Sequence, residues 1–211
     1  MNGNARFIAV TSGCGGVGTT SLAVALGRVL SRLNEKNVLY VSLELLSSKS
    51  NMPGGMSERD FLECYENIMV NAEKKEFDIS SDVMTDPYGL KYLKCDDVFN
   101  PLHSAISSID TFLIQMNLDY DAVILDVPVN SALGFTLFPL CENVVMNYGI
   151  AQPHRKKYCD EFLKLIMNFC QESRFHNFSC GFDDFSFKDG DVDIHGEFGA
   201  EVRRLAAEIG F

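Results

Sequence analysis

Apolar runs alternate with segments of helical spacing along much of this chain. Apolar residues dominate positions 7–10, 38–43 and 120–127, which predicts buried strands. Between the first two runs, residues 21–30 repeat apolar side chains at helical spacing and predict a helix. Strands that alternate with helices are typical of crossover units. The pattern therefore predicts an α/β fold, a three-layer, mostly parallel, doubly wound sheet with helices on both faces.

The remaining segments have weaker signals. The pattern predicts a loop at residues 47–55, a short strand at 90–93, and helices at about 57–72, 104–116, 155–169 and 199–209. The length of 211 residues is an ordinary size for one domain. We therefore expect residues 1–211 to form a single domain.

A glycine-rich stretch, GCGGVGTTS at residues 13–21, follows the first predicted strand and opens the first predicted helix. We call it the glycine segment. In P-loop proteins such glycines let backbone N–H groups converge on phosphate, and the helix N-terminus favours an anion. The pattern GxxxxGK[ST] puts Thr19 at the lysine position and Thr20 at the position of the magnesium hydroxyl. The predicted nucleotide-binding residues are those of the whole segment: Gly13, Cys14, Gly15, Gly16, Val17, Gly18, Thr19, Thr20 and Ser21.

A carboxylate closes the apolar run YDAVILDVP at residues 120–128. P-loop proteins use an acid at the end of such a strand, here Asp126, to hold magnesium. Hydroxyl and carboxylate oxygens are the hard ligands that Mg²⁺ prefers. Thr20 and Asp126 are therefore the predicted metal site, and the expected cofactors are ATP or ADP with Mg²⁺.

Together the two motifs resemble a known family. CGGVGTT and YDAVILDVP are similar to the deviant Walker A and Walker B segments of ParA/MinD-family P-loop ATPases, and the nearest branch is the CpaE/TadZ-like proteins. The resemblance spans nearly the whole chain, is strong at residues 6–30 and 120–128, and is poor between 45 and 85. It implies a P-loop NTPase fold, a homodimer that binds ATP, and protein partners in a pilus, secretion or cell-positioning system.

Three positions depart from the family pattern. The signature lysine falls on Cys14, the second lysine on Thr19, and the acid that orients the attacking water on Ser42. Losing a cation from a phosphoryl-transfer site costs several kcal/mol, or about a hundredfold or more in rate. The backbone amides and the helix dipole remain. We therefore expect nucleotide binding with weak or no ATP hydrolysis, and we assign no catalytic residue.

Two other function classes stay open. A nucleotide-free interaction scaffold would use only the fold, and the loss of both lysines favours it. An active P-loop ATPase or related enzyme would need those lysines, or cysteines placed for a cluster, and is disfavoured. The retained glycines, with Thr20 and Asp126, favour the nucleotide-dependent positioning factor over both.

Charge and hydropathy indicate which partners and which cellular location to expect. A net charge of −11 opposes the basic surface that DNA binding requires. No run approaches the ~18 apolar residues of a membrane span, and the start MNGNARF lacks the features of a secretory signal, so we expect a cytoplasmic protein. The last predicted helix carries two acids beside its two arginines. We therefore expect no autonomous membrane binding, and recruitment to a membrane complex or cell pole only through a partner.

The cysteines and one basic run are further candidates for a functional role. The seven cysteines include no CxxC pair, which predicts reduced and mostly buried thiols. Cys14 is either a small residue in the place of a lysine or a redox trigger whose pKa the helix N-terminus lowers. The run Arg155, Lys156 and Lys157 is either a solvated helix face or a contact for an acidic partner or lipid.

Overall fold

The computed structural model describes most, but not all, of the chain: residues 5–42, 83–94, 120–129, 132–149, 153–179, 187–188 and 191–211. The loop predicted at 47–55 and the helices predicted at 57–72 and 104–116 lie outside these ranges.

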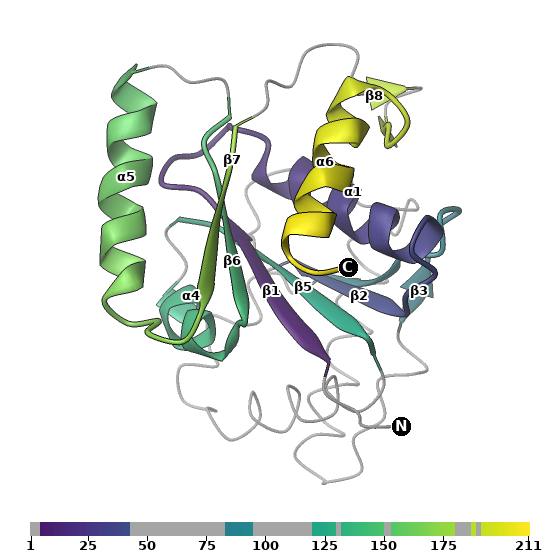
Figure 1. Cartoon of the computed structure of the whole chain (residues 1–211), viewed down its shortest axis with the longest axis horizontal. Helices are drawn as coiled ribbons and strands as arrows, with labels where there is room; N and C mark the ends of the chain where they lie inside the picture. The colour runs from purple at the N-terminus through teal and green to yellow at the C-terminus, as the bar shows by residue number, and fades with distance from the viewer. Residues whose placement is uncertain are drawn as a thin grey trace, which may run out of the picture.

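A seven-stranded sheet runs through the described part of the molecule in the order β3-β4-β2-β5-β1-β6-β7 (Figure 1). Its strands are β1 (Arg6–Thr11), β2 (Val38–Ser42), β3 (Met84–Thr85), β4 (Lys91–Lys94), β5 (Ala122–Val127), β6 (Asn143–Asn147) and β7 (Arg174–Phe178). All neighbouring strands pair in parallel except β3 with β4. The prediction of a mostly parallel α/β sheet is confirmed. A separate antiparallel pair comprises β8 (Phe187–Lys188) and β9 (Asp191–Val192).

The central strands of the sheet are buried, as the apolar runs in the sequence predict. All six residues of β5 are buried, as are all five of β2 and of β6. Strands covered on both faces show a continuous apolar run rather than alternation, because neither face meets water.

Helices cover this sheet from both sides. They are α1 (Thr19–Arg32), α4 (Ala132–Leu137) with the 3₁₀ turn η4 (Phe138–Leu140), α5 (Pro153–Met167) and α6 (Glu197–Glu208). The chain crosses the sheet in one direction from β1 to β2 and in the other from β5 to β6 and β7. Because parallel crossovers are almost always right-handed, α1 lies on one face and α4 and α5 on the other, which is the doubly wound arrangement.

Contacts between the helices agree with these two layers. Helices α1 and α6 pack against each other and lie side by side in Figure 1. The ring of Phe162 in α5 lies 6.1 Å from that of Phe135 in α4 and 6.3 Å from that of Phe138 in η4. Helix α5 begins at Pro153, two residues before the predicted start, because proline is favoured in the first turn of a helix.

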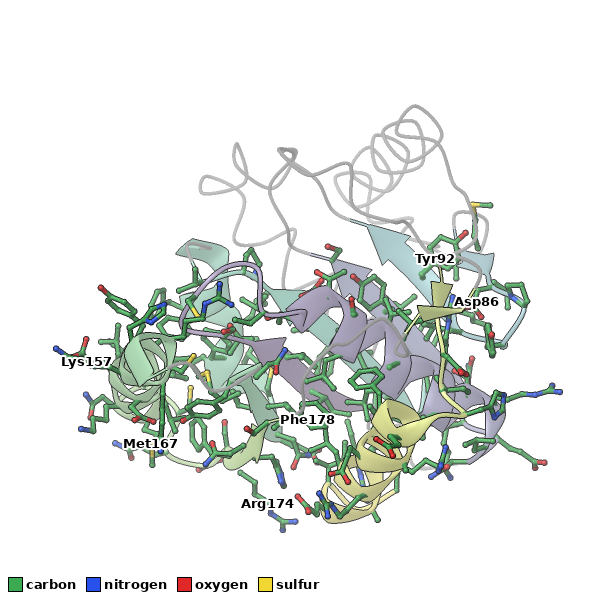
Figure 2. All side chains as sticks on the ribbon, turned by 90° about the horizontal axis from the view of Figure 1, so that it is seen from above. Asp86, Tyr92, Lys157, Met167, Arg174 and Phe178 are labelled. Atoms are coloured by element: carbon green, nitrogen blue, oxygen red, sulfur yellow. The ribbon has the colours of Figure 1, made fainter. Side chains whose placement is uncertain are left out.

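A buried ion pair joins α1 to the turn before β4, and the sequence pattern did not predict it. Arg28 Nε donates a 2.7 Å hydrogen bond to Asp86 Oδ2, and both side chains are fully buried. The other Asp86 oxygen accepts hydrogen bonds from the backbone N–H groups of Tyr88 and Leu90. Figure 2 shows Asp86 at the end of the molecule opposite α5, which carries Lys157 and Met167.

Candidate nucleotide-binding site

The glycine segment and Asp126 meet at one edge of the sheet. The segment follows β1, and in the parallel register Val10 of β1 pairs with Asp126 of β5, as does Ser42 of β2. Thr11 Oγ1 also donates a 2.8 Å hydrogen bond to the carbonyl oxygen of Val127. Ligands of open parallel sheets bind outside these carboxyl ends, so the topology brings the two predicted motifs to the expected place.

Two glycines of the segment adopt a left-handed backbone. Gly16 has φ 70° and Gly18 has φ 81° and ψ 29°, a conformation that residues with a Cβ rarely adopt. Gly18 is the N-cap of α1 and contributes no side-chain hydrogen bond. The N–H groups of the first helical turn are therefore left for an anion, since a helix N-terminus has four such donors without intrahelical partners.

Strand β6 supplies the groups that fix the inner end of the segment. Asn147 Nδ2 donates a 3.0 Å hydrogen bond to the carbonyl oxygen of Val17, and the backbone N–H of Gly149 donates one of 3.0 Å to Asn147 Oδ1. Gly149 has φ 60°, and a Cβ there would lie 2.9 Å from Val17 Cβ. Sequence reasoning missed both residues. The available signal was an asparagine followed closely by a glycine at the end of the apolar strand 143–147.

The outer end of the segment is partly closed and partly open. A Cβ on Gly13 would lie 2.5 Å from Cys159 Cα and 2.5 Å from the carbonyl oxygen of Tyr158, so the loop touches the backbone of α5. Gly15 is exposed, and a Cβ there would have no heavy atom within 4 Å. The segment thus leaves space on its solvent side.

Asp126 is almost completely buried and engaged by a tyrosine. Asp126 is only 2% exposed, and Tyr40 Oη donates a 2.9 Å hydrogen bond to its Oδ2. Thr20 lies in the first turn of α1 and is half-buried. The hydroxyl and the carboxylate are oxygen donors of the kind that suits Mg²⁺. Tyr40 is a third residue that sequence reasoning missed.

The pKa of the Cys14 thiol is raised, not lowered. Burial, and then the neighbouring Cys159 thiol, raise the pKa of Cys14, and these causes outweigh the positive charge of Arg155, which lowers it. The prediction that the helix N-terminus lowers the pKa of Cys14 is therefore wrong. The four cysteines within the described ranges are free thiols, and three of them are buried: Cys141, Cys159 and Cys170.

A hollow at the opposite edge of the sheet is separate from this site. It lies at the amino ends of β1, β6 and β7, lined among others by Arg6, Glu142 and Arg174. Arg6 Nη1 donates a 2.7 Å hydrogen bond to the carbonyl oxygen of Gly210, and its guanidinium lies over the ring of Phe211. Arg6 thus holds the C-terminus of the chain against the sheet.

Solved structures share this fold. A ParA family ATPase from Chlorobium tepidum TLS has a TM-score of 0.66 at 15% identity, covering 97% of this chain and 81% of that one. A putative plasmid partition protein from Borrelia burgdorferi B31, bound to AMPPNP, has a TM-score of 0.65 at 14% identity and 98% coverage of both chains. Cobyrinic acid a,c-diamide synthase from Mycobacterium smegmatis, with bound ADP and magnesium, has a TM-score of 0.61 at 14% identity, covering 97% and 81%.

No protein-family model matches the chain, and no curated protein does. At the low identities of these structures the likeness establishes the fold, which is that of ParA/MinD-type P-loop ATPases.

Proposed function

We propose that this protein binds ATP or ADP with Mg²⁺ at the glycine segment and acts as a ParA/MinD-like positioning or assembly factor. In this proposal it hydrolyses ATP slowly or not at all. The observation that carries the proposal is the hydrogen bond from Asn147 Nδ2 to the carbonyl oxygen of Val17. It holds the glycine segment in shape from β6 while leaving the solvent side at Gly15 open.

Magnesium binding is proposed for Thr20 and Asp126. A hydroxyl and a carboxylate fit this cation, and phosphate oxygens and water would complete its preferred octahedron. When bound, Mg²⁺ would neutralise phosphate charge. Tyr40 would orient the Asp126 carboxylate through its hydrogen bond to Oδ2.

Arg155 is proposed to supply part of the positive charge that the two missing lysines would have provided. It lies one turn before Cys159 on α5, and Cys159 Sγ is 3.9 Å from Cys14 Sγ in the glycine segment. Its charge also lowers the pKa of the Cys14 thiol, although burial has the larger, opposite effect. A guanidinium at this position would attract a phosphate without reaching across a dimer.

Slow turnover follows from the residues at the three altered positions. Cys14 and Thr19 carry no charge that could stabilise the transferring phosphoryl group. Ser42, which pairs in register with Asp126 and is 2% exposed, offers a hydroxyl in place of the water-orienting carboxylate. The nucleotide would then act as a ligand that stabilises one assembly state, and exchange would reset it.

The biological setting belongs to the same proposal. A homodimer would cover the carboxyl edge of the sheet, where Gly15 and Gly16 are exposed. The CpaE/TadZ-like resemblance supports a role in pilus assembly or cell positioning, with the protein in the cytoplasm and recruited by a partner to a membrane-associated complex or cell pole. Among the described helices, none has the length and apolar content to span a bilayer.

A nucleotide-free scaffold is the second candidate. One observation favours it, since Tyr40 already occupies one oxygen of the carboxylate that would serve magnesium. In that case the glycine segment would be only a structural turn, and the carboxyl edge would dimerise without a ligand.

Calorimetric titration with ATP and MgCl₂ separates the two candidates. The main variant is Asp126→Asn. This substitution removes the negative charge, while the amide oxygen can still accept the hydrogen bond from Tyr40. The control is Asp121→Asn, at the exposed amino end of the same strand, where Asp121 Oδ2 accepts the backbone N–H of Asn37. Saturable binding that weakens about tenfold or more in Asp126→Asn alone would support the proposal. No binding at millimolar ATP would favour the scaffold, and rapid phosphate release would contradict slow turnover.

A further inference from the structure

Two thiols from distant parts of the chain meet beside the glycine segment. Cys14 Sγ in the segment lies 3.9 Å from Cys159 Sγ in α5, and the two residues are 145 positions apart. Ser12 Oγ lies 4.0 Å from the first sulfur and 3.6 Å from the second. The two sulfurs are already at van der Waals contact.

The backbone next to Cys14 lies close to the backbone of Cys159. A Cβ on Gly13 would lie 2.5 Å from Cys159 Cα, so the residue before Cys14 is in contact with the backbone of α5. Disulfides join residues whose Cα atoms are about 4.4–6.8 Å apart. A side chain at position 13 would keep the segment away from the helix, and glycine allows the approach.

The two thiols differ in access. Cys159 is completely buried, and its Sγ donates to the carbonyl oxygen of Asn147 at 3.9 Å. Cys14 is half-buried beside the exposed Gly15. An oxidant from solution therefore reaches Cys14 first, and Cys159 is the neighbouring thiol that can resolve the product.

We propose that Cys14 and Cys159 form a reversible disulfide in exchange with a small-molecule disulfide such as oxidised glutathione, and that this cross-link withdraws the glycine segment from nucleotide binding. The effect on nucleotide rests on the function proposed above. A disulfide of this kind is transient in a reducing compartment and forms under oxidative conditions.

The exchange balances in two steps. The Cys14 thiolate attacks one sulfur of the oxidised glutathione, an S–S bond breaks, and one glutathione thiolate leaves. The Cys159 thiolate then attacks Cys14 Sγ and releases the second glutathione thiolate. The two cysteine protons end on the two glutathione molecules, so the protein is oxidised by two electrons and the small disulfide is reduced.

Closing the bond moves the loop rather than the helix. The sulfurs must approach from 3.9 Å to about 2.05 Å, the length of an S–S bond. Cys159 is buried within a helix of 15 residues, whereas Gly15 and Gly16 are exposed on the loop side. The backbone N–H of Cys14, which now donates to Ser12 Oγ at 3.3 Å, would move with its sulfur. The amides of the segment would no longer converge on one phosphate.

The cross-link itself is tested by peptide mapping. The reduced full chain is incubated with oxidised glutathione at pH 8, alkylated, digested without reductant and analysed by mass spectrometry. The expected product is one linked peptide pair containing Cys14 and Cys159, lighter by two hydrogen atoms and separated by dithiothreitol. In Cys159→Ala, Cys14 should remain as a glutathione adduct, and in the control Cys170→Ala the linked pair should form as in the parent. A lasting adduct in the parent, a bond from Cys14 to another cysteine, or an unmodified Cys14 would overturn the proposal.

The effect on nucleotide is measured on the same samples. ATP affinity, with MgCl₂ present, should fall at least tenfold in the cross-linked protein and return after dithiothreitol. Equal ATP affinity of the reduced and the cross-linked protein would overturn the proposal that the disulfide withdraws the glycine segment from nucleotide binding. If the reduced chain binds no ATP, the function proposed above fails together with this effect, whereas the peptide map still decides on the disulfide.

Discussion

Asn147 and Val17 are joined by a 3.0 Å hydrogen bond from the side-chain amide of one to the backbone carbonyl of the other, across 130 positions of sequence. Asn147 is completely buried, and its oxygen accepts the N–H of Gly149. One side chain therefore fixes the glycine segment from the neighbouring strand. The fold itself therefore determines the shape of the loop, without a bound ligand.

Replacing Asn147 with alanine should destabilise the protein. The change leaves a carbonyl and an N–H without partners in a buried place, and each such group costs about 1–3 kcal/mol. We expect the free energy of unfolding to fall by about 2–4 kcal/mol in urea titrations, and ATP affinity to fall with it. The control is Asn168→Ala, an exposed asparagine after α5, which should stay within about 0.5 kcal/mol of the parent. Equal stability of both variants would show that the hydrogen bond does not hold the loop.

Gly13 and Gly15 should respond differently to the same substitution. In Gly13→Ala the new Cβ would meet backbone atoms of α5 at 2.5 Å, so the helix or the loop must shift. Overpacking of this kind costs about 1–3 kcal/mol. In Gly15→Ala the Cβ would enter open space and the stability should change by less than about 0.5 kcal/mol.

Denaturant unfolding of the two variants checks this contrast, and ATP titration extends it. Gly15→Ala should keep the fold and still weaken ATP binding, because the methyl group would occupy space beside the loop amides. Normal ATP affinity in a well-folded Gly15→Ala protein would contradict the assignment of that space to phosphate.

The sequence predicted the parts of the site that depend on local order. A buried strand, glycines and a helix start are adjacent in the chain, so the glycine segment could be placed, and Asp126 could be placed by the apolar run before it. Asn147 and Tyr40 could not be assigned, because their partners are distant in sequence and only the strand order brings them together. The raised pKa of Cys14 could not be predicted for the same reason, since Cys159, which contributes to the rise, lies 145 positions away on α5.

Arg155 should matter for nucleotide binding and its neighbour should not. Arg155→Ala removes the charge that acts on Cys14 from α5, so we expect about tenfold weaker ATP binding, equivalent to about 1.4 kcal/mol. The matched control is Lys156→Ala, since Lys156 is the next cation along the helix and is exposed. Equal losses in both variants would indicate general electrostatic attraction instead of a placed cation.

Alkylation gives a second readout for Arg155 that needs no nucleotide. Its charge favours the Cys14 thiolate, so Arg155→Ala should slow the reaction of Cys14 with iodoacetamide at pH 8, as measured by peptide mass spectrometry. Lys156→Ala should leave that rate unchanged. An unaltered rate in Arg155→Ala would remove the electrostatic link between α5 and the glycine segment.

The Arg28–Asp86 pair should be costly to break from one side. Asp86→Ala leaves a buried guanidinium without its carboxylate, although Arg28 Nη1 keeps its 3.1 Å hydrogen bond to the carbonyl oxygen of Val192. Such single removals cost about 3–5 kcal/mol. The exposed pair of Arg204 and Glu201 provides the comparison, and Glu201→Ala should cost less than about 1 kcal/mol. Urea unfolding of both variants tests this, and a similar small loss in each would mean that water or other groups replace the Asp86 carboxylate.

Stability should decline on the alkaline side because buried acids resist ionisation in the folded protein. Burial, and then the nearby Cys170, raise the pKa of the Cys141 thiol, while burial and the hydrogen bond to Asp160 raise the pKa of Tyr148 to about 12. A group whose folded pKa lies above its unfolded pKa contributes stability that is complete below the unfolded value and is lost as pH rises toward the folded value. For Cys141 that loss begins near the ordinary thiol pKa of about 8.5 and approaches about 1.4 kcal/mol per pH unit.

Urea unfolding between pH 7 and 10, with reductant present, measures this slope. The parent should be level to about pH 8 and then lose stability, and Cys141→Ala should reduce the slope by about 1.4 kcal/mol per pH unit near pH 10, since alanine has no proton to release. The conservative control is Asp193→Asn, at a half-buried carboxylate that accepts the N–H of His195, and its slope should equal that of the parent because this variant keeps Cys141 and Tyr148. A Cys141→Ala slope that matches the parent would mean that Cys141 ionises as readily in the folded state as in the unfolded chain, which its burial opposes.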